Sequence, residues 1–589
     1  MWYEKTIKIA QHGQLSLNSL EDKIFSFLRQ ANSDLGLNCQ MLVAGGWVRD
    51  KLLNVESDDI DIAIDMLGYD FAQKINEYAK SKGIEGVGSP HRLSLEKSAD
   101  PSETPKDDLS VGGIDVFGLT IELVPMRKES YNEESRTPSI ELTNDPKEDV
   151  LRRDLTINAM YYNIATGQVD DYVGGMDDLG INGSGVINLK TPDDAKKTFM
   201  EDPLRMLRAL RFFSRYPNSQ LDPSIIGSMQ DPEIHEAWRS KVSPSRCGKE
   251  MTKMMEGEKP ADALEHLLDS GLYNLVFTGD LMGDVHQDGI KMDQQTPYHK
   301  YSLMKHTIEV VRNMNDLMNQ HDEPKEMRGT MNMAAVFHDF GKMFNGIQQP
   351  HFGREEKEKP EKDRKPTMYT DKDGVERERM GYFGHEEQSA EMSQEIMTNM
   401  GINPAKKKFI DKIIRMHMRP HKTETPWTGK SMGKFIRNTK DKGLEETNPE
   451  WNDRLWKYVW YHAQADNMGS GRELETEKYE GGIKKFEDHI QLQAEKGVTL
   501  EPLVNGTEIM QIITVQEIHP KTGYIREINE ALQGLQDDGS ISTKEEGIAK
   551  IWEMKPELIQ KYNPVAVEPP APVQQGQVNT ELDTNGWYR

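Results

Sequence analysis

Cysteine is nearly absent from this 589-residue chain, which contains only Cys39 and Cys247. Two cysteines cannot form a disulfide framework in a chain of this size, so a protein of the reducing cytosol is predicted. Long hydrophobic runs are lacking as well, and none approaches the roughly 18 apolar residues that span a bilayer. The first five residues resemble neither a secretory signal nor an organellar transit peptide. A cytoplasmic protein without a membrane partner is therefore expected.

Positive charge is also in short supply, since 73 Lys and Arg face 98 Asp and Glu and give a net charge of -25. This balance argues against simple non-specific RNA binding, which depends on neutralising phosphates. A polynucleotide partner would therefore need a local basic surface. One candidate is the segment Lys406–Lys442, with twelve basic residues against Asp411, Glu424 and Asp441. A merely solvated helix face is the alternative explanation for this segment.

The order of sequence patterns predicts a multidomain α/β + α protein. Strand patterns at Met41–Ala44 and Ile60–Ile64, with a short helical stretch between them, indicate an α/β unit with a small mixed or antiparallel sheet. Later segments show helical periodicity, and a charged insert at Arg354–Met380 interrupts one of them. The predicted units are an α/β domain at 1–165, a helical domain at 166–285, a linker at 286–297, a helical domain at 298–480, a helical tail at 485–560 and a disordered Pro- and Gln-rich end at 563–589.

Two carboxylates in the α/β unit indicate phosphoryl chemistry. Asp59 and Asp61 are predicted on one strand, where side chains two residues apart share a face and can converge on Mg²⁺. Two such ions could orient a triphosphate for in-line displacement. Glu122, on a later predicted strand, is the candidate third carboxylate. Upstream, Gly45-Gly46 would let the backbone approach phosphate, and Arg49 would pair with it.

The order and spacing of these motifs are more specific than any one of them. The run Gly45–Leu53, followed by Asp58–Ile62, closely resembles the first motif of class II CCA-adding enzymes and bacterial poly(A) polymerases, members of the polymerase β nucleotidyltransferase superfamily. Arg152–Ala159 is similar to the ribose-recognition motif of that family, and Asp170–Leu179 to its flexible hinge. Glu201–Arg205 resembles the base-reading motif. The resemblance covers about residues 40–280 and implies a nucleotidyltransferase head followed by a helical neck.

The resemblance also implies a role for each matching residue. Asp59, Asp61 and Glu122 would be catalytic, with Mg²⁺ bound to the two aspartates. The implied nucleotide-binding residues are Gly45, Gly46, Arg49, Arg152, Arg153, Asp154, Asn158, Asp202 and Arg205, whereas Arg246 and Glu250 would be structural.

Asp202 and Arg205 provide a physical reason for choosing C and A. They are predicted three residues apart at the start of a helix that opens with Glu201, Asp202 and Pro203, so both can face one base. Cytosine and adenine each present an amino group beside a ring acceptor, which an Asp–Arg pair satisfies. Uracil and guanine present the reverse order and would leave buried polar groups unpaired. A simple helix-surface ion pair is the alternative.

A second set of candidate ligands follows in the next helical segment. Imidazole and carboxylate together suit a divalent transition metal. The set resembles the HD superfamily of metal-dependent phosphohydrolases, which implies four ligands and two further histidines for a second metal. The four are His306, His338, Asp339 and Asp466, and the further two are His385 and His417.

These resemblances predict a tRNA nucleotidyltransferase that adds CCA from CTP and ATP, with an attached HD phosphohydrolase and a tRNA-binding helical tail. The head is more similar to eukaryotic CCA-adding enzymes, whereas the HD module is more similar to bacterial ones. Two alternatives remain open. The chain could be a poly(A) polymerase, which uses the same motifs with A alone. It could also be an HD nucleotide phosphohydrolase whose head is a degenerate RNA-binding module.

Overall fold

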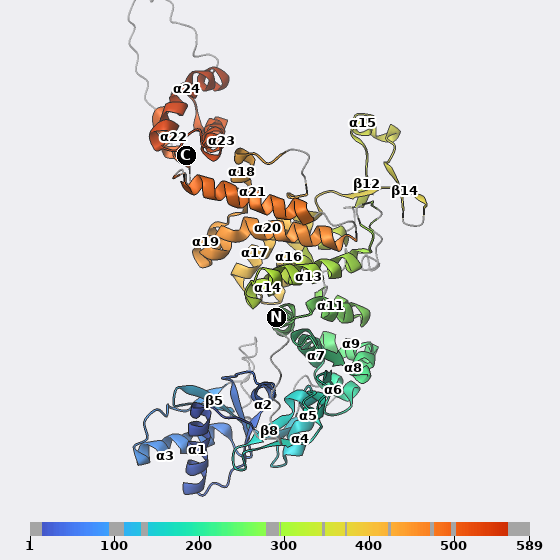
Figure 1. Ribbon diagram of the computed structural model, residues 1–589, viewed down its shortest axis with the longest axis vertical. Helices are drawn as coiled ribbons and strands as arrows, with labels where there is room; N and C mark the ends of the chain where they lie inside the picture. The colour runs from blue at the N-terminus through green and yellow to red at the C-terminus, as the bar shows by residue number, and fades with distance from the viewer. Residues whose placement is uncertain are drawn as a thin grey trace, which may run out of the picture.

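The computed structural model is an elongated molecule whose parts follow one another along its long axis (Figure 1). A head (15–171) lies at one end, followed by a neck (175–277), a central domain (299–495) and a tail (503–563) at the other end. The structure describes residues 15–93, 111–130, 139–277, 294, 296–297, 299–343, 348–371, 374–421, 426–471, 476–495, 497 and 502–563. Most of the predicted linker at 286–297 and residues 564–589 of the predicted disordered end lie outside these ranges.

The head is built on a seven-stranded sheet with strand order β3-β4-β5-β2-β1-β8-β9. Its strands β2 and β5 pair in parallel, and the other neighbours pair antiparallel, as the predicted mixed sheet requires. The head elements are α1 (Ser19–Asp34), β1 (Met41–Ala44), α2 (Gly46–Leu52), β2 (Ile60–Ile64), α3 (Gly68–Lys82), β3 (His91–Leu93), β4 (Val111–Val116), β5 (Leu119–Pro125), β6 (Arg127–Ser130), β7 (Ser139–Leu142), α4 (Pro146–Leu151), η2 (Thr156–Asn158), β8 (Met160–Asn163) and β9 (Gln168–Asp171).

Both faces of β1 are buried, which explains its continuous apolar sequence. Met41 and Val43 join the main core of the molecule, whereas Leu42 and Ala44 pack with Tyr161 in a smaller cluster on the opposite face. The sheet therefore has a buried centre, and β1 is packed on both faces as far as its last residue, Ala44.

The head extends beyond the predicted boundary at residue 165, because β9 pairs with β8 and completes the sheet. The neck is also not entirely helical, since β10 and β11 form a short parallel pair. The neck elements are α5 (Gly175–Asp178), β10 (Ile187–Leu189), α6 (Ala195–Glu201), α7 (Leu204–Arg215), β11 (Ser219–Leu221), α8 (Pro223–Met229), α9 (Pro232–Lys241), α10 (Pro244–Met255), α11 (Pro260–Asp269) and α12 (Leu272–Phe277).

The central domain is a helical bundle from which a small β arm projects (Figure 1). The arm corresponds to the predicted charged insert, and β13 and β14 form its hairpin. The elements are α13 (Leu303–Gln320), α14 (Lys325–Phe337), η5 (Phe340–Met343), β12 (Gln348–Pro350), α15 (Arg354–Lys357), η6 (Glu361–Asp363), β13 (Met368–Thr370), β14 (Glu376–Glu378), β15 (Met380–Tyr382), α16 (His385–Asn399), α17 (Pro404–Met416), α18 (Gly429–Thr439), α19 (Lys442–Thr447), α20 (Pro449–Gly469) and α21 (Thr476–Glu495).

The tail is a separate helical unit with its own apolar core. It contains α22 (Gly506–Ile512), η7 (Pro520–Thr522), α23 (Tyr524–Asp537) and α24 (Lys544–Tyr562). The predicted boundary at 480–485 falls inside α21. That helix belongs to the central domain, because Tyr479, Ile483 and Phe486 are buried in the main core. Within the described ranges, none of the helices has the length and apolar character needed to cross a membrane.

Candidate functional sites

The register of β2 against β5 brings the predicted carboxylates together. Asp61 is the partner of Glu122 in this pairing and the partner of Ala44 in the pairing with β1. Paired residues of neighbouring strands point to the same face, so Asp61 and Glu122 share one face of the sheet. Asp59 was predicted on the strand, but β2 begins at Ile60 and the preceding loop supplies Asp59.

The electrostatic environment of Asp61 is that of a cation site. Burial, together with the carboxylates of Asp59 and Glu122, raises the pKa of Asp61 to about 7, and the Arg153 guanidinium opposes this shift. Clustered carboxylates disfavour one another's charged form. A hard divalent cation relieves that repulsion and prefers oxygen ligands.

Asp59 and Asp61 open into a cleft of about 810 Å³ that extends from the head into the neck. Eleven basic and seven acidic side chains line it, which is a local excess of four positive charges in a chain whose net charge is -25. Every predicted nucleotide-binding residue lines this cleft, and Glu122 does not. The lining residues include Gly45, Gly46, Arg49, Arg152, Arg153, Asp154, Asn158, Asp202, Arg205, Arg246 and Glu250.

The Gly45-Gly46 turn carries the chain from β1 into α2. Gly45 has a φ of +72°, a conformation that favours glycine, and its missing side chain leaves the backbone open toward the cleft. Arg49 follows within α2 and is buried. It donates to the side chain of Asn158 and pairs with Asp50 at 2.9 Å. The first turn of α2 is thereby tied to the ribose-recognition segment.

A buried carboxylate orients the two predicted arginines. Asp149 accepts from Arg152 at 2.7 Å and from Arg153 at 3.1 Å. It also accepts from the Tyr161 hydroxyl. Burial alone would raise the pKa of Asp149, but the two guanidinium groups hold it well below its usual range. Because Asp149 stays charged, it fixes both arginines along the cleft.

Asp154 is held in the same way by residues from the neck. Burial opposes its charge, but the Arg208 guanidinium at 2.7 Å and the amide of Asn158 at 3.1 Å keep its pKa low. Arg208 and Arg211 also contact the carboxylate of Glu250, at 3.4 and 3.1 Å. Glu250 therefore braces α10 against α7. The two arginines were missed, although they continue the helical spacing that starts at Arg205.

Asp202 and Arg205 both line the cleft, but the helix start predicted for them is wrong. Glu201 is the last residue of α6 and Asp202 follows in an extended conformation. Pro203 lacks an N–H and disfavours a helical residue before it, so α7 begins only at Leu204. The side chains also have separate partners. Asp202 accepts from Arg246 at 2.8 Å, whereas Arg205 donates to Glu201 and to backbone carbonyls of Thr198 and Arg152.

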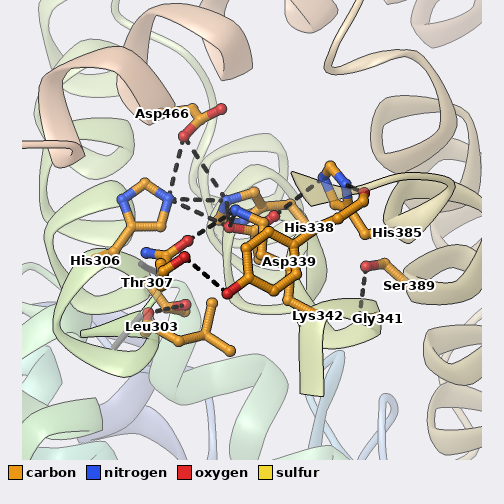
Figure 2. A network of polar contacts seen from close by, with 12 residues as sticks. Leu303, His306, Thr307, His338, Asp339, Gly341, Lys342, His385, Ser389 and Asp466 are labelled. Carbon is orange, nitrogen blue, oxygen red and sulfur yellow. Dashed lines mark hydrogen bonds and ion pairs between the residues drawn. The ribbon is translucent and has the colours of Figure 1, made fainter. Parts of the chain in front are cut away.

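The central domain collects all six predicted ligands in its buried interior. Nε2 of His306 lies 3.3 Å from Nε2 of His338, and Nε2 of His385 lies 3.3 Å from Nε2 of His417. Asp339 lies between His306 and His385 (Figure 2). One of its carboxylate oxygens is 3.4 Å from His306 and the other is 3.3 Å from His385. Asp466 approaches His306 to 3.1 Å. A single carboxylate thus bridges two histidine pairs.

Backbone carbonyls fix which ring nitrogen faces the centre of this cluster. Nδ1 of His306 lies 3.0 Å from Gly469 O, and Nδ1 of His338 lies 2.7 Å from Ala335 O. His385 and His417 contact the carbonyls of Tyr382 and Ile414 in the same way. Since a carbonyl only accepts, Nδ1 of each ring carries a proton and Nε2 points inward. Nε2 atoms about 3.3 Å apart match two ligands bound about 2.1 Å from one ion.

Cationic groups balance the carboxylates of this cluster. His338 and Lys342 hold the pKa of Asp339 well below its usual range despite its burial. Burial opposes charge on His306, but hydrogen bonds to Asp339 and Asp466 raise its pKa to about 9. His417, buried beside His385 and His338, has a strongly lowered pKa.

Several residues of the cluster carried no separate signal in the sequence. His421 contacts Asp466 at 3.0 Å and the Tyr479 hydroxyl at 2.8 Å, and its position four residues after His417 could have indicated it. His462 lies four residues before Asp466 on α20 and packs edge-on against His338. Gln294, inside the predicted linker, is buried and accepts from Lys342 at 2.9 Å.

Two cations of the basic segment Lys406–Lys442 are used in contacts between domains. Lys406 is buried and pairs with Glu256 of the neck at 3.5 Å. Arg437 pairs with Asp537 of the tail. These cations act in contacts between domains, and the residues between His421 and Pro426 lie outside the described ranges.

Comparison with known families gives two matches. Residues 41–183, which cover most of the head, match the family described as the poly A polymerase head domain. Residues 240–279 match a family described as a probable RNA and SrmB-binding site of polymerase A. They include all of α10, α11 and α12, and several residues between Arg246 and Glu258 line the cleft.

Curated relatives match the head and neck. The mitochondrial CCA tRNA nucleotidyltransferase of Saccharomyces cerevisiae is 41% identical over 238 residues, or 40% of this chain and 42% of the yeast protein. The CCA-adding enzyme of Bacillus pumilus is 31% identical over 237 residues, or 40% of this chain and 50% of that protein. The chain thus spans half or less of these relatives. The greater identity to the yeast protein agrees with the predicted eukaryotic character of the head.

Solved structures are similar in fold over most of the chain. One, described as a CCA-adding enzyme in apo form II, aligns with a TM-score of 0.52 over 91% of this chain and 95% of its own, at 17% identity. Another, described as a CCA-adding enzyme complexed with CTP, aligns with a TM-score of 0.50 over the same share of this chain. The segment that matches the poly A polymerase head model therefore lies within a chain whose fold is similar to theirs over most of its length.

Proposed function

We propose that this protein adds CCA to the 3′ end of tRNA from CTP and ATP. One observation carries the proposal: Asp59, Asp61, the Gly45-Gly46 turn and the pair Asp202 and Arg205 all line a single cleft. Such a cleft can hold phosphate at one end and a base at the other. The names of the yeast and Bacillus relatives support CCA addition as the reaction.

Mg²⁺ fits the carboxylate end of this cleft. The ligands are oxygen atoms, and the raised pKa of Asp61 reports an uncompensated cluster of acids. Bound there, Mg²⁺ would supply charge stabilisation for in-line nucleotidyl transfer. Around it, Arg153 and Arg152 would hold the triphosphate, and Gly45 would admit it to the backbone. Glu122 would keep Asp61 oriented from the neighbouring strand.

Base selection is assigned to Asp202 and Arg205. In the ligand-free arrangement each is held by other groups, Asp202 by Arg246 and Arg205 by Glu201. A nucleotide base would compete with these contacts through its amino group and ring acceptor. Cytosine and adenine satisfy both side chains, whereas uracil and guanine leave them unpaired. The pair would therefore admit C and A.

A primer-extension assay separates this function from its alternatives. The substrate is tRNA lacking its terminal CCA, incubated with labelled CTP and ATP singly and together. Addition of C, C and A followed by arrest is expected. Long A tails would identify a poly(A) polymerase, and the absence of any extension would contradict nucleotidyl transfer.

We further propose that the central domain is an HD-type metal-dependent phosphohydrolase. The inward-facing Nε2 atoms on both sides of Asp339 favour this second activity. Four neutral imidazoles and two carboxylates suit divalent transition metals. His306, His338, Asp339 and Asp466 would hold one ion, and Asp339, His385 and His417 would hold another. The bound metal would activate water for attack on a phosphate ester.

Phosphate release from nucleoside 2′,3′-cyclic phosphates and monophosphates would test this activity. The purified full chain is stripped of metal and reloaded with Ni²⁺, Mn²⁺, Co²⁺ or Mg²⁺. Hydrolysis with at least one transition metal, lost in His338→Ala, is expected. No release with any of the four metals would contradict the proposal.

The tail is proposed to bind tRNA, and the cytoplasmic location remains a prediction.

A further inference from the structure

The far wall of the head–neck cleft contains a residue from the central domain. Arg208, Arg211 and Lys253 belong to the neck helices α7 and α10, whereas Lys325 is the first residue of α14. Among the described residues that line the cleft, Lys325 alone comes from beyond the neck. The central domain therefore completes a cavity whose carboxylates lie in the head.

Close packing fixes the central domain against the neck. A Cβ added at Gly248 of α10 would lie 2.1 Å from the Met400 carbonyl oxygen, and one added at Gly329 of α14 would lie 2.4 Å from Glu256. The amide of Asn332 donates to the carbonyl of Met255 at 2.9 Å. Backbones this close leave no space for sliding, so α14 holds Lys325 at a defined position along the cleft.

The central domain also changes the charge of the cleft indirectly. Glu256 and Glu258 of the neck both line it. Lys406 approaches Glu256 to 3.5 Å, and Arg328 approaches Glu258 to 3.1 Å. Both cations belong to the central domain and are largely buried. Arg328 offsets the charge of Glu258, and Lys406 is shared between Glu256 and Glu326 of the central domain. Lys325 adds a positive charge of its own.

Two of the lysines differ from the arginines around them. Arg208 and Arg211 are paired with the acids Asp154 and Glu250. Lys253 and Lys325 are exposed, and neither makes an ion pair within the part of the chain that the structure describes. Exposed cations without an acidic partner can bind the phosphates of a polyanion, even on a protein whose net charge is negative. Here the two cations come from helices of two different domains.

We propose that the central domain forms part of the RNA-binding track, in which Lys253 and Lys325 bind backbone phosphates near the 3′ end of the acceptor. The inference rests on the proposed nucleotidyl transfer for the identity of the RNA. Phosphates of the incoming nucleotide already have ligands beside the carboxylates, at Gly45 and Arg153. The lysines of α10 and α14 are therefore assigned to the second substrate, which must reach the same carboxylates with its 3′ hydroxyl.

Direct binding tests this role without relying on catalysis. Fluorescence anisotropy with a labelled tRNA acceptor minihelix lacking CCA gives the Kd of the full-length protein over a series of KCl concentrations. Lys325→Ala should weaken binding by about two- to fivefold at low salt, the range of one exposed charge pair. Loss of one phosphate contact should also reduce the slope of log Kd against log salt by about 0.7 to 0.9. Lys253→Ala should behave similarly.

Matched variants separate a phosphate contact from a structural effect. Lys325→Arg keeps the charge and should retain the slope. Lys485→Ala removes an exposed lysine from α21, outside the cleft, and should bind as the parent does. Lys406→Gln leaves Glu256 uncompensated and should weaken RNA binding without removing a lining lysine. CTP and ATP binding, measured by calorimetry, should not change in Lys325→Ala.

The outcomes also distinguish this inference from the proposed reaction. If Lys325→Ala binds the minihelix with parental affinity and slope, or weakens CTP binding instead, the inference is wrong. If the parent protein binds the minihelix with this lysine dependence but does not extend tRNA, nucleotidyl transfer fails and the RNA track stands. If the parent does not bind the minihelix, the RNA track fails.

Discussion

The two candidate metal sites both contain carboxylates but differ in how strongly positive groups balance them. In the head, Asp59, Asp61 and Glu122 lie together, and burial with mutual repulsion raises the pKa of Asp61 although the Arg153 guanidinium opposes this shift. In the central domain, Asp339 is surrounded by imidazoles and Lys342, and its pKa is lowered. Positive groups therefore do not offset the repulsion in the first cluster, whereas in the second they do.

This difference predicts different behaviour without metal. In the central domain a proton on His306, stabilised by Asp339 and Asp466, can take the place of the missing cation. The head has no comparable substitute except protonation of Asp61 itself. We therefore expect the head site to depend on Mg²⁺ in an open cleft, whereas the buried histidine site retains its shape when empty.

The largest expected effect comes from removing a head carboxylate. Asp61→Ala should lower the rate of tRNA extension more than about a hundredfold. Loss of a group that only supports a metal ligand lowers activity by up to about a hundredfold, and loss of the ligand itself should lower it more. Hydrolysis by the central domain should remain, because its ligands lie in another domain. Extension and phosphate release are measured on the same preparation, with Glu56→Gln as the control for a nearby exposed acid. Parallel loss of both activities would show that the sites are not separate.

The reciprocal change tests the bridging carboxylate of the central domain. Asp339→Ala removes the group shared by both histidine pairs, so it should abolish transition-metal binding as well as hydrolysis. Metal content after dialysis, measured by mass spectrometry, should fall to the background level. tRNA extension should remain within about twofold of the parent. Retention of the full metal content would contradict the bridging role of Asp339, and His519→Ala serves as an exposed histidine control.

Local patterns predicted the parts of both sites that lie close in sequence or on regular strands. The strand alternation of β2 and the turn at Gly45 follow from short-range chemistry, and the family motifs supplied Asp202 and Arg205. The six ligands that the family resemblance implies lie together, whereas His421 and His462 beside them were not predicted. In each case the sequence carries a signal that does not depend on how the domains dock.

What could not be predicted depends on docking and on competing local rules. Lys325 lines the cleft only because Gly248 and Gly329 allow two domains to approach closely. No pattern around Lys325 encodes that contact. The helix start at Asp202 was misplaced because acidic residues before a proline suggest an N-terminus, whereas here Glu201 is the last residue of α6 and Asp202 is extended. The domain boundary near residue 480 failed because α21 continues the apolar contacts of the central core.

We expect pH to have a moderate effect on the stability of the head. The pKa of Asp61 is about 7 in the folded protein against 3.8 as its ordinary value. The folded state therefore holds the proton more tightly, and stability falls as pH rises from about 4 to 7 and is then constant. In EDTA, Asp61→Asn should raise the melting temperature relative to the parent, with a difference that grows over this range and levels off above pH 7. Added Mg²⁺ should stabilise the parent more than the variant. A difference independent of pH would contradict repulsion as the cause.

The smallest effect is expected at a neck carboxylate that already has a cationic partner. Arg246 donates to Asp202 at 2.8 Å, and both side chains are partly exposed, so Arg246→Gln should cost less than about 1 kcal/mol of stability. The pair nevertheless holds Asp202 where a base is expected to bind. Its loss should lower the preference for CTP over UTP by about two- to fivefold, the range set by one such ion pair. Competition between the two nucleotides in single-turnover extension measures this ratio. Unchanged discrimination would show that Asp202 is oriented by the backbone around Pro203 rather than by Arg246. The contrast between carboxylates with and without a cationic partner would then not apply to base selection.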